Sequence, residues 1–513
     1  MKNRHPHHRC NISPLKNLIV FGAVAAFIVL STPMIIPTSG QTVQNFDGSE
    51  SIYVEDQMAI SHAPAYYEYH ADNLGKLNPS FCRNNIVWFE CAREFGKEAG
   101  IYDFSRYEDE YNNLFARGIE PLGCFIYGWG WWPNNKEVPQ EDWPLYYDFV
   151  EAFVSHFNET LTYYEMWNEP EIGFWPDSDE LFFQFLGNIT QLVRENDETA
   201  IIVCPPVTGP NIDYVDKMIT RFGDDTFDDM FDVFSFHTYC GRAPESLTQR
   251  IRDLKVVLDN HGIDDPLWIS EVGFSTAVDN DEQIDTMVPF NWEFQAVQVI
   301  KVYSQAFMHN ISTMFWYCLN DWCDTDEMRG EGRFGLMHCA DPDTYQFEFK
   351  PGGYAYYTLN EITNGSIYYP HGFNINSPPG GKVWASYFYT PRDTCVISLW
   401  SENIGDRCTF QVCNPESGTD LDYELTIYDY QRNSSRIVKD GQDFQFALNS
   451  TPWLFEINYT GDLQDEGVSL QPLTVDVNVS LSGGRVALLI IAPIPGLAGL
   501  IIIIFKNREG IVR

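Results

Sequence analysis

The stretch Leu161-Thr162-Tyr163-Tyr164-Glu165-Met166-Trp167-Asn168-Glu169-Pro170 is an apolar and aromatic run that ends in an Asn-Glu pair. Such a run predicts a buried strand, and its polar end predicts a carboxyl group at the rim of a sheet. About a hundred residues later, Pro266-Leu267-Trp268-Ile269-Ser270-Glu271-Val272-Gly273 repeats the pattern. The chain therefore carries two glutamates, each at the end of a predicted strand.

Around these two segments, residues 80–363 alternate between strand-like runs and amphipathic helical stretches. Strands are predicted at 85–90, 120–127, 162–167, 200–204, 232–237, 267–271 and 313–318. Helices are predicted at 107–117, 146–157, 180–195, 214–222, 247–260, 294–308 and 353–362. An eighth, earlier strand is expected within 53–62. Because strands that alternate with helices imply a parallel sheet, the fold class is α/β, and eight such units predict a (β/α)8 TIM barrel over residues 41–363.

The pattern changes after the predicted barrel. Alternating runs at 383–389, 395–400, 409–412, 423–430 and 453–458 are separated by turn residues. They predict a smaller antiparallel β-sandwich domain over residues 364–465. Residues 466–485 are expected to form a short tether.

Both ends of the chain carry apolar segments. A basic region followed by the apolar run 18–36 predicts a signal peptide or signal anchor within residues 1–40. Residues 486–505 are long enough for a transmembrane helix, and cations follow in an expected cytoplasmic tail at 506–513. A buried helix is the alternative, which Pro493, Pro495 and the lack of a polar face disfavour. The prediction is a body on the extracellular side of the membrane, with a single-pass C-terminal anchor.

Charge and modification signals bear on the partners of the chain. A net charge of −40 argues against nucleic acid, whose phosphates would be repelled. Nine N-x-Ser/Thr sequons agree with an exterior glycoprotein, although each triplet alone is a weak signal. They lie at Asn11, Asn158, Asn188, Asn310, Asn364, Asn433, Asn449, Asn458 and Asn478.

The cysteines predict disulfides and no metal centre. Of twelve, Cys10 lies in the leader, so eleven remain. By proximity Cys323 pairs with Cys339 and Cys408 with Cys413, which an extracellular location allows. No CxxC or Cys/His cluster has zinc spacing, so we expect neither a metal nor a cofactor. Four other cysteines lie in or at the ends of apolar strand-like runs and are expected to be buried thiols: Cys124, Cys204, Cys240 and Cys318.

The chemistry of a TIM barrel lies at the C-terminal ends of its strands. In the predicted order, Glu169 ends the fourth strand and Glu271 the seventh, while His237 ends the sixth with Tyr239 two residues later. Two carboxyl groups at strand ends are the minimum equipment for cleaving a glycosidic bond. The eighth strand contains a further candidate, Trp316.

Arg83 precedes the second predicted strand and completes the set of candidate site residues. Each candidate also has a structural interpretation. Arg83 would then be an ion-pair partner of Glu165, His237 a hydrogen-bonded core histidine, and Trp316 a core side chain.

One part of this pattern resembles a known group of enzymes. Tyr164-Glu165-Met166-Trp167-Asn168-Glu169-Pro170, with Phe174-Trp175 after it, resembles glycoside hydrolase clan A, whose retaining TIM-barrel members carry catalytic glutamates after strands four and seven. It is most similar to family 39, which includes β-xylosidases and iduronidases, and families 5 and 42 are close competitors. The resemblance covers roughly residues 80–363. Glu171-Ile172 departs from it, because family 39 usually has Asn and an apolar residue there.

The resemblance implies a carbohydrate substrate, an oligo- or polysaccharide, and a role for each glutamate. Glu169 would be the general acid/base and Glu271 the nucleophile, with carboxyl groups about 5–5.5 Å apart. Asn168 would bind the sugar 2-hydroxyl.

The remaining candidates would support these three. Arg83 and Tyr239 would hydrogen-bond Glu271 and keep it ionised. His237 would bind the sugar or the acid/base, and Trp316 would form a platform beneath the sugar ring.

The expected function is therefore a retaining β-glycosidase, which hydrolyses O-glycosidic bonds by double displacement through a covalent glycosyl-enzyme intermediate. One alternative is a non-catalytic glycan-binding or cell-envelope protein, which the presence of both glutamates disfavours. Another is a transglycosylase, which would use the same residues.

Overall fold

The computed structural model of the chain describes residues 52–53, 58–130, 136–241, 243–277, 291–323, 330–368, 373–376, 383–390, 394–402, 407–413, 423–429, 434–439, 444–447, 451–459, 474–480, 486–492 and 500–506. The predicted signal segment at 1–40 lies outside these residues, as do most of the predicted tail at 506–513 and two parts of the predicted tether, 466–473 and 481–485.

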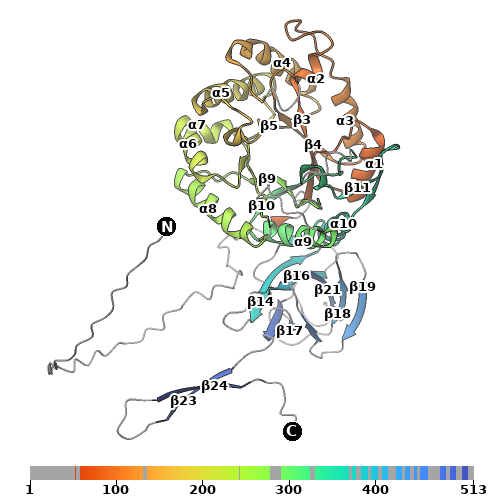
Figure 1. The fold of residues 1–513 in the computed structure, drawn as a ribbon, viewed down its shortest axis with the longest axis vertical. Coiled ribbons are helices and arrows are strands. Elements are labelled where there is room, and N and C mark those ends of the chain that lie inside the picture. Colours follow the sequence, from red (N-terminus) through yellow and green to blue (C-terminus); the bar gives the residue numbers. More distant parts are fainter. Residues whose placement is uncertain are drawn as a thin grey trace, which may run out of the picture. The chain divides into compact units, whose positions relative to one another are not determined.

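A nine-stranded parallel sheet forms a TIM-barrel-like fold, in the order β6-β5-β4-β3-β2-β10-β9-β8-β7. Helices surround this sheet as a ring in Figure 1. The strands are β2 (Met58–Ser61), β3 (Phe81–Ile86), β4 (Glu120–Phe125), β5 (Tyr163–Met166), β6 (Ile201–Val203), β7 (Val207–Thr208), β8 (Phe234–His237), β9 (Leu267–Val272) and β10 (Ile311–Tyr317).

The two ends of this sheet meet. β6 and β7 are separated by three residues, and Val203 pairs with Val233 in a parallel bridge just before β8. The amide of Cys204 donates to the carbonyl of Val233 at 2.9 Å. β6 and β7 are therefore two halves of one interrupted strand. The strand predicted at 200–204 is confirmed as β6, and β7 was not predicted.

Seven of the described helices lie close to their predicted positions, and three others, at Glu68–Leu77, Trp88–Ala92 and Asp224–Met230, were not predicted. The described α-helices are α1 (Glu68–Leu77), α2 (Trp88–Ala92), α3 (Ser105–Phe115), α4 (Trp143–Phe157), α5 (Asp179–Asn196), α6 (Ile212–Phe222), α7 (Asp224–Met230), α8 (Ser246–His261), α9 (Trp292–Met308) and α10 (Pro351–Thr363). Local capping defines several of their starts, because side chains of Ser178, Asn211 and Asn291 each accept a bond from a backbone amide three residues later.

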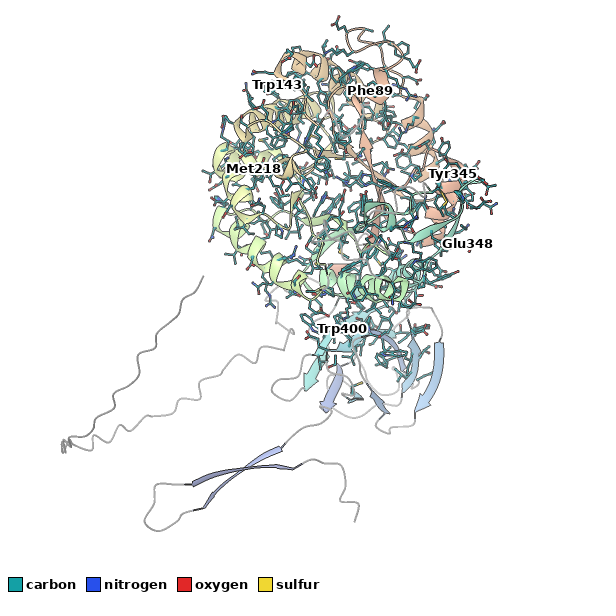
Figure 2. All side chains as sticks on the ribbon, in the orientation of Figure 1. Phe89, Trp143, Met218, Tyr345, Glu348 and Trp400 are labelled. Atoms are coloured by element: carbon teal, nitrogen blue, oxygen red, sulfur yellow. A yellow bond between two sulfur atoms is a disulfide. The ribbon has the colours of Figure 1, made fainter. Side chains whose placement is uncertain are left out.

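Two apolar layers hold the barrel together. Seven buried side chains from the strand segments form one cluster inside it: Ala59, Phe81, Leu122, Val203, Val233, Trp268 and Phe315. A larger cluster packs the outer faces of the strands against the helices, and Figure 2 marks Trp143 of α4 and Met218 of α6 within it. Consecutive residues such as Met58, Ala59 and Ile60 alternate between the two layers.

The strand predicted at 85–90 is wrong by about four residues. β3 ends at Ile86, and α2 begins at Trp88. Arg83 therefore lies inside the strand and does not precede it. The run Phe81-Cys82-Arg83 contains a charged residue, so its sequence does not indicate a buried strand. The structure nevertheless buries Arg83 completely, which is rare for arginine.

Two further sheets follow the barrel. One has seven strands in the order β1-β13-β15-β16-β21-β18-β19. Their bounds are β1 (Ile52–Tyr53), β13 (Ile367–Tyr368), β15 (Val383–Tyr389), β16 (Thr394–Ser401), β21 (Trp453–Tyr459), β18 (Tyr423–Tyr428) and β19 (Ser434–Lys439). All of its pairings are antiparallel. The predicted runs 383–389, 395–400 and 453–458 lie in its strands, and the run predicted at 423–430 is a strand over 423–428.

The other sheet has four strands, β14 (Phe373–Asn376), β22 (Thr474–Ser480), β17 (Arg407–Cys413) and β20 (Phe444–Ala447). β22 lies within the predicted tether, so that expectation is wrong for residues 474–480. β22 pairs with β14 and β17, which places its backbone groups in a hydrogen-bonded ladder that a free tether would lack. Face-to-face packing of the two sheets as a sandwich stays a prediction.

The predicted transmembrane helix is not what the structure has at the C-terminal apolar segment. β23 (Val486–Ala492) and β24 (Leu500–Lys506) pair as antiparallel strands. Among the described residues, no helix combines the length and the apolar character needed to cross a bilayer. The sequence offers a physical reason, because the segment is rich in β-branched isoleucine and two prolines interrupt it.

The cysteines behave largely as expected. A disulfide joins Cys323 and Cys339, which confirms that pair. Thiols at the four strand-associated positions are buried, as predicted: Cys124, Cys204, Cys240 and Cys318. The predicted pair of Cys408 and Cys413 is wrong, because both residues lie in the extended strand Arg407–Cys413. Five residues of strand separate their Cα atoms by roughly 16 Å, whereas a disulfide needs less than about 7 Å.

Candidate active site

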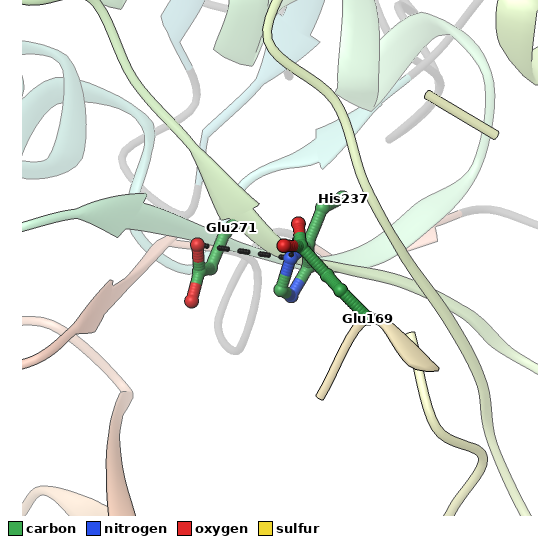
Figure 3. Close-up of side chains that lie close together, drawn as sticks. All are labelled: Glu169, His237 and Glu271. Atoms are coloured by element: carbon green, nitrogen blue, oxygen red, sulfur yellow. Dashed lines mark hydrogen bonds and ion pairs between the residues drawn. The ribbon is translucent and has the colours of Figure 1, made fainter. Parts of the chain in front are cut away.

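Buried polar side chains gather at the C-terminal ends of the barrel strands. Glu169 follows β5, His237 ends β8, and Glu271 is the last residue but one of β9. Glu169 and Glu271 are each 7% exposed, and His237 is fully buried. Figure 3 shows both carboxylates beside the imidazole, which brings together three residues that lie up to about a hundred positions apart in the chain.

The backbone after β5 is unusual where it leaves the strand. Trp167 has φ 82° and Glu169 has φ 38°, and both angles lie in the left-handed region that L-residues rarely adopt. The amide of Glu169 donates to the carbonyl of Pro206 at 3.1 Å, and the indole of Trp167 donates to the carbonyl of Phe174 at 3.1 Å. These bonds hold a strained turn that directs Glu169 toward His237.

Arg83 of β3 is joined to β5 and β9 through one buried guanidinium. Its Nε donates to Oε2 of Glu165 at 2.6 Å, and its Nη1 donates to Oε1 of Glu271 at 2.8 Å. Its Nη2 donates to Oδ1 of Asn168 at 2.7 Å. Burial opposes its charge, but Glu165 and Glu271 raise its pKa above the ordinary arginine value. Both interpretations of Arg83 therefore hold, since it is an ion-pair partner of Glu165 and a ligand of Glu271.

Glu271 has a hydrogen-bond donor on each oxygen. Arg83 occupies Oε1, and the hydroxyl of Tyr239 donates to Oε2 at 2.6 Å. Burial and the nearby Glu271 raise the pKa of Tyr239 well above its ordinary value, so the phenol keeps its proton. The two donors hold the carboxyl group of Glu271 in one orientation.

His237 lies between the two glutamates. Its Nδ1 is 2.7 Å from Oε1 of Glu169 and 3.6 Å from Oε2 of Glu271, and its Nε2 is 3.1 Å from the hydroxyl of Ser270. Burial acts to lower the pKa of His237, but Glu271 and Glu169 raise it overall. Burial likewise acts to raise the pKa of Glu169, but His237, Thr208 and Arg83 together lower it. These opposite pKa shifts favour a protonated imidazole beside an ionised Glu169.

Trp316 is not brought into this site. It is fully buried between β10 and the helices, its indole donates to the carbonyl of Phe334 at 3.1 Å, and its ring stacks on Phe274 at 6.0 Å. The expectation of a sugar platform at Trp316 is therefore wrong. Neighbouring strand residues face opposite sides, and Phe315 faces the barrel interior, so Trp316 faces outward.

Tyr317, the next residue, lies on the site side and is half-buried. Its ring is 5.1 Å from the ring of His62 and 6.5 Å from that of Tyr239. One of the three aromatic residues Phe315-Trp316-Tyr317 faces the site. Which one it is depends on the register of β10, and the pairing of Tyr317 with Ser61 defines that register.

His62 is a further site residue that the sequence did not reveal. It follows β2, and its Nδ1 lies 2.7 Å from the hydroxyl of Ser61 and 3.9 Å from Oε1 of Glu271. Burial, aided by Arg83, lowers the pKa of His62 to about 3, so the imidazole is neutral. The sequence could have revealed His62 only through the eighth strand. That strand was expected within 53–62 without defined bounds, so the residue at its end was not identified.

Glu171, which departs from the family 39 pattern, does not reach His237. Its Oε1 accepts a bond from the amide of Thr208, and burial raises its pKa. Glu171 therefore anchors the turn after Glu169 to β7.

Three ligand atoms, one each from Glu169, His237 and Glu271, lie within 4.8 Å of one another and have the spacing of a metal site. The donor set fits a cation poorly. Arg83 already places a positive charge 2.8 Å from Glu271, and Tyr239 occupies the other oxygen of that carboxylate. A divalent ion would have to displace these donors and face the guanidinium.

The fold has relatives among solved structures, whereas no protein-family model and no curated protein sequence matches the chain. It is similar to a family 39 glycoside hydrolase from the gut symbiont Bacteroides cellulosilyticus WH2, with TM-score 0.58 and 16% identity over 78% of this chain and 81% of that one. It is also similar to a glucosidase from Croceicoccus marinus, with TM-score 0.53 and 14% identity over 80% of this chain and 98% of that one.

A family 51 arabinofuranosidase from Xanthomonas axonopodis pv. citri has TM-score 0.53 and 11% identity over 80% of this chain and 93% of that one. At these identities the comparisons establish the fold. The fold expected from the resemblance to clan A and family 39 is thereby confirmed.

Proposed function

We propose that the protein is a retaining β-glycosidase. The observation that carries the proposal is the approach of the two carboxyl groups, since one oxygen from each lies within 4.8 Å of the other. Retaining enzymes hold their carboxyl groups about 5–5.5 Å apart, whereas inverting enzymes need about 6.5–9.5 Å to admit a water molecule. Solved structures of similar fold bear the names glycoside hydrolase, glucosidase and arabinofuranosidase, which agrees with this function.

In the first half of the reaction, Glu271 attacks the anomeric carbon and the bond to the leaving oxygen breaks. Glu169 supplies the proton that the leaving oxygen takes. The hydrogen bond of 2.7 Å between Glu169 and His237 gives that proton a short path from the imidazole to the carboxylate. His237 therefore acts as the store of the proton that Glu169 delivers.

In the second half, Glu169 accepts a proton from water, which attacks the glycosyl-enzyme and releases Glu271. Arg83 and Tyr239 stabilise the departing carboxylate, because each already donates to one of its oxygens. Asn168 is oriented by Arg83 at 2.7 Å, and its amide nitrogen is the group proposed to donate to the sugar 2-hydroxyl.

The proposed location is outside the cytosol. The disulfide between Cys323 and Cys339 supports it, because such bonds persist in oxidising compartments. The sequons and the N-terminal apolar run agree. Mass spectrometry of the native protein after alkylation, without and with reductant, tests this location, and a fully reduced Cys323–Cys339 pair in protein taken from its source would contradict it.

The function is tested by assaying the purified protein on aryl β-xyloside, β-glucoside, β-galactoside and β-mannoside, and by following the first-formed sugar by proton NMR. We expect turnover of at least one glycoside, with the β-anomer formed first. An α-anomer formed first would contradict the retaining step. Absence of turnover on all four and on polysaccharides would favour a glycan-binding protein. Transfer to added acceptor sugars in preference to water would favour the transglycosylase.

A further inference from the structure

A cavity of about 290 Å³ adjoins the candidate active site on the side of β2 and β3. Its volume is close to the lower end of the range for ligand pockets, about 300–1,000 Å³, and far exceeds the space of one water molecule. Residues that line it include His62, Tyr66, Asn84, Arg106, Glu110 and Tyr127. It contains neither Glu169 nor Glu271, so it lies beside the reacting carboxylates and does not coincide with them.

The polar side of the cavity is a pre-formed hydrogen-bonding pair. The amide of Ala63 donates to Oδ1 of Asn84 at 3.1 Å, and Nδ2 of Asn84 donates to Oε1 of Glu110 at 2.8 Å. No described residue bonds Oε2 of Glu110, although this glutamate is only 2% exposed. Oε2 of Glu110 is therefore the group of this wall that can form a hydrogen bond with a ligand hydroxyl.

Glu110 suits hydroxyl groups in either protonation state. Burial raises its pKa to about 7, although Arg106 and Asn84 act to lower it. Near neutral pH the carboxyl group is therefore available both as donor and as acceptor. A sugar hydroxyl is also both donor and acceptor, whereas a cationic ligand would require the ionised form alone.

The opposite side of the cavity combines aromatic and cationic groups. Cζ of Arg106 lies 4.3 Å from the ring centroid of Tyr66, and its Nη1 is paired with Glu90. Tyr127, with φ 65°, closes another part of the wall. Aromatic rings pack on the apolar faces of sugars, and the fixed guanidinium offers further donors to hydroxyl groups.

The position of the cavity shows which part of a bound substrate it would contact, the leaving group or the sugar that becomes attached to Glu271. Glu169, the proton donor of the proposed function, lies at β5, so the leaving group must lie near β5. His62, which lines the cavity, instead lies 3.9 Å from Oε1 of the nucleophile Glu271. In the sheet, β2 and β3 are separated from β5 by β4. The cavity therefore lies on the side of the sugar that becomes attached to Glu271.

We propose that this cavity is a second sugar subsite on that side, with Glu110 and Tyr66 as its main contacts, so that the preferred substrate is an oligosaccharide with at least two sugar units on the non-reducing side of the cleaved bond. The proposal rests on the proposed glycosidase function. It excludes an enzyme that is adapted to remove single terminal sugars. Binding energy from the second unit would be used to position the first one over the nucleophile.

The test compares kcat/KM for aryl β-glycosides of a disaccharide and of a monosaccharide that carry the same sugar at the cleaved bond. The pairs are xylobioside with xyloside, cellobioside with glucoside, and the corresponding galactose and mannose pairs. For the sugar that is turned over, we expect the disaccharide-to-monosaccharide ratio to be about tenfold or more in the wild-type protein, and Glu110→Ala and Tyr66→Ala each to lower it by about tenfold.

Asp109→Asn is the matched control, because Asp109 is the exposed neighbour of Glu110 on α3, and it should leave the ratio unchanged. Tyr66 is half-buried, so its variant remains informative if Glu110→Ala does not fold. A ratio near one in the wild-type protein, or one that neither variant changes, would overturn the subsite while leaving the glycosidase intact. No turnover of any glycoside of either length would overturn the glycosidase and the subsite together.

Discussion

Nδ1 of His237 lies 2.7 Å from Oε1 of Glu169, so a buried imidazole and a buried carboxyl group form a short hydrogen bond. The same nitrogen lies 3.6 Å from Glu271, and both carboxylates raise the pKa of the imidazole against the effect of burial. Their charges therefore favour a proton on the imidazole, next to Glu169, the proton donor of the proposed function.

Glu271→Gln should lower kcat/KM on the best aryl β-glycoside by at least about a thousandfold, because a carboxamide is a poor nucleophile. Initial rates under pseudo-first-order conditions measure the effect. Glu198→Gln is the control, since Glu198 is exposed and its loss should change kcat/KM by less than about twofold. Near-full activity of Glu271→Gln would remove this residue from the proposed role.

Glu169→Ala should lower kcat/KM by roughly 10²–10⁴-fold for glycosides with poor leaving groups, because general acid catalysis is lost. Dinitrophenyl glycosides, which need no proton, should be much less affected. Added azide should accelerate turnover and form the β-glycosyl azide, since the anion replaces the water that Glu169 activates. Formation of the α-glycosyl azide would instead assign Glu169 as the nucleophile.

Arg83→Met should reduce the free energy of unfolding by about 3–5 kcal/mol, because it leaves Glu165 and Glu271 buried without their cation. Denaturant titration measures the change. Arg93→Met, at an exposed arginine next to Glu94, should change stability by less than about 0.5 kcal/mol. Equal stability of the two variants would show that the guanidinium does not hold the strand ends together.

The alkaline limb of the pH profile of kcat/KM should lie above pH 6.5, the ordinary histidine value, because the raised pKa of His237 retains the shared proton. In His237→Asn this limb should move to lower pH, since Glu169 must then keep the proton alone. Rates at subsaturating substrate between pH 4 and 9 give both profiles. An unmoved limb would mean that His237 does not share the catalytic proton.

His237 and Glu169 also make the free energy of unfolding depend on pH. The raised pKa of His237 stabilises the fold fully below pH 6.5, and this contribution is lost as pH rises through the folded-state value. The lowered pKa of Glu169 stabilises the fold above pH 4.5, and this contribution is lost as pH falls through its folded-state value. The stability difference between wild type and His237→Asn, from denaturant titrations, should therefore be largest between about pH 4.5 and 6.5. A difference that grows above pH 8 would contradict the raised pKa.

How far prediction from the sequence succeeds can be seen at β10 and β3. The apolar run at β10 is evident, but neighbouring positions on a strand face opposite sides, so a shift of one residue exchanges the core residue Trp316 for the site residue Tyr317. At β3 the buried charge of Arg83 interrupts the apolar pattern and displaces the predicted strand. Both errors arise because local pattern carries no information on which side chain has a partner across the barrel.

The order of strands and helices, the two glutamates and their placement at strand ends all follow from local hydrophobic periodicity and from the way parallel strands align their ends. Those properties depend on near neighbours in the chain, so they could be predicted without coordinates. The ion pairs of Arg83, the proton shared by His237 and Glu169, the position of His62 and the cavity beside Glu110 depend on groups from different strands. Only closure of the sheet brings these groups within hydrogen-bond distance, because burial and electrostatics act through space and not along the chain.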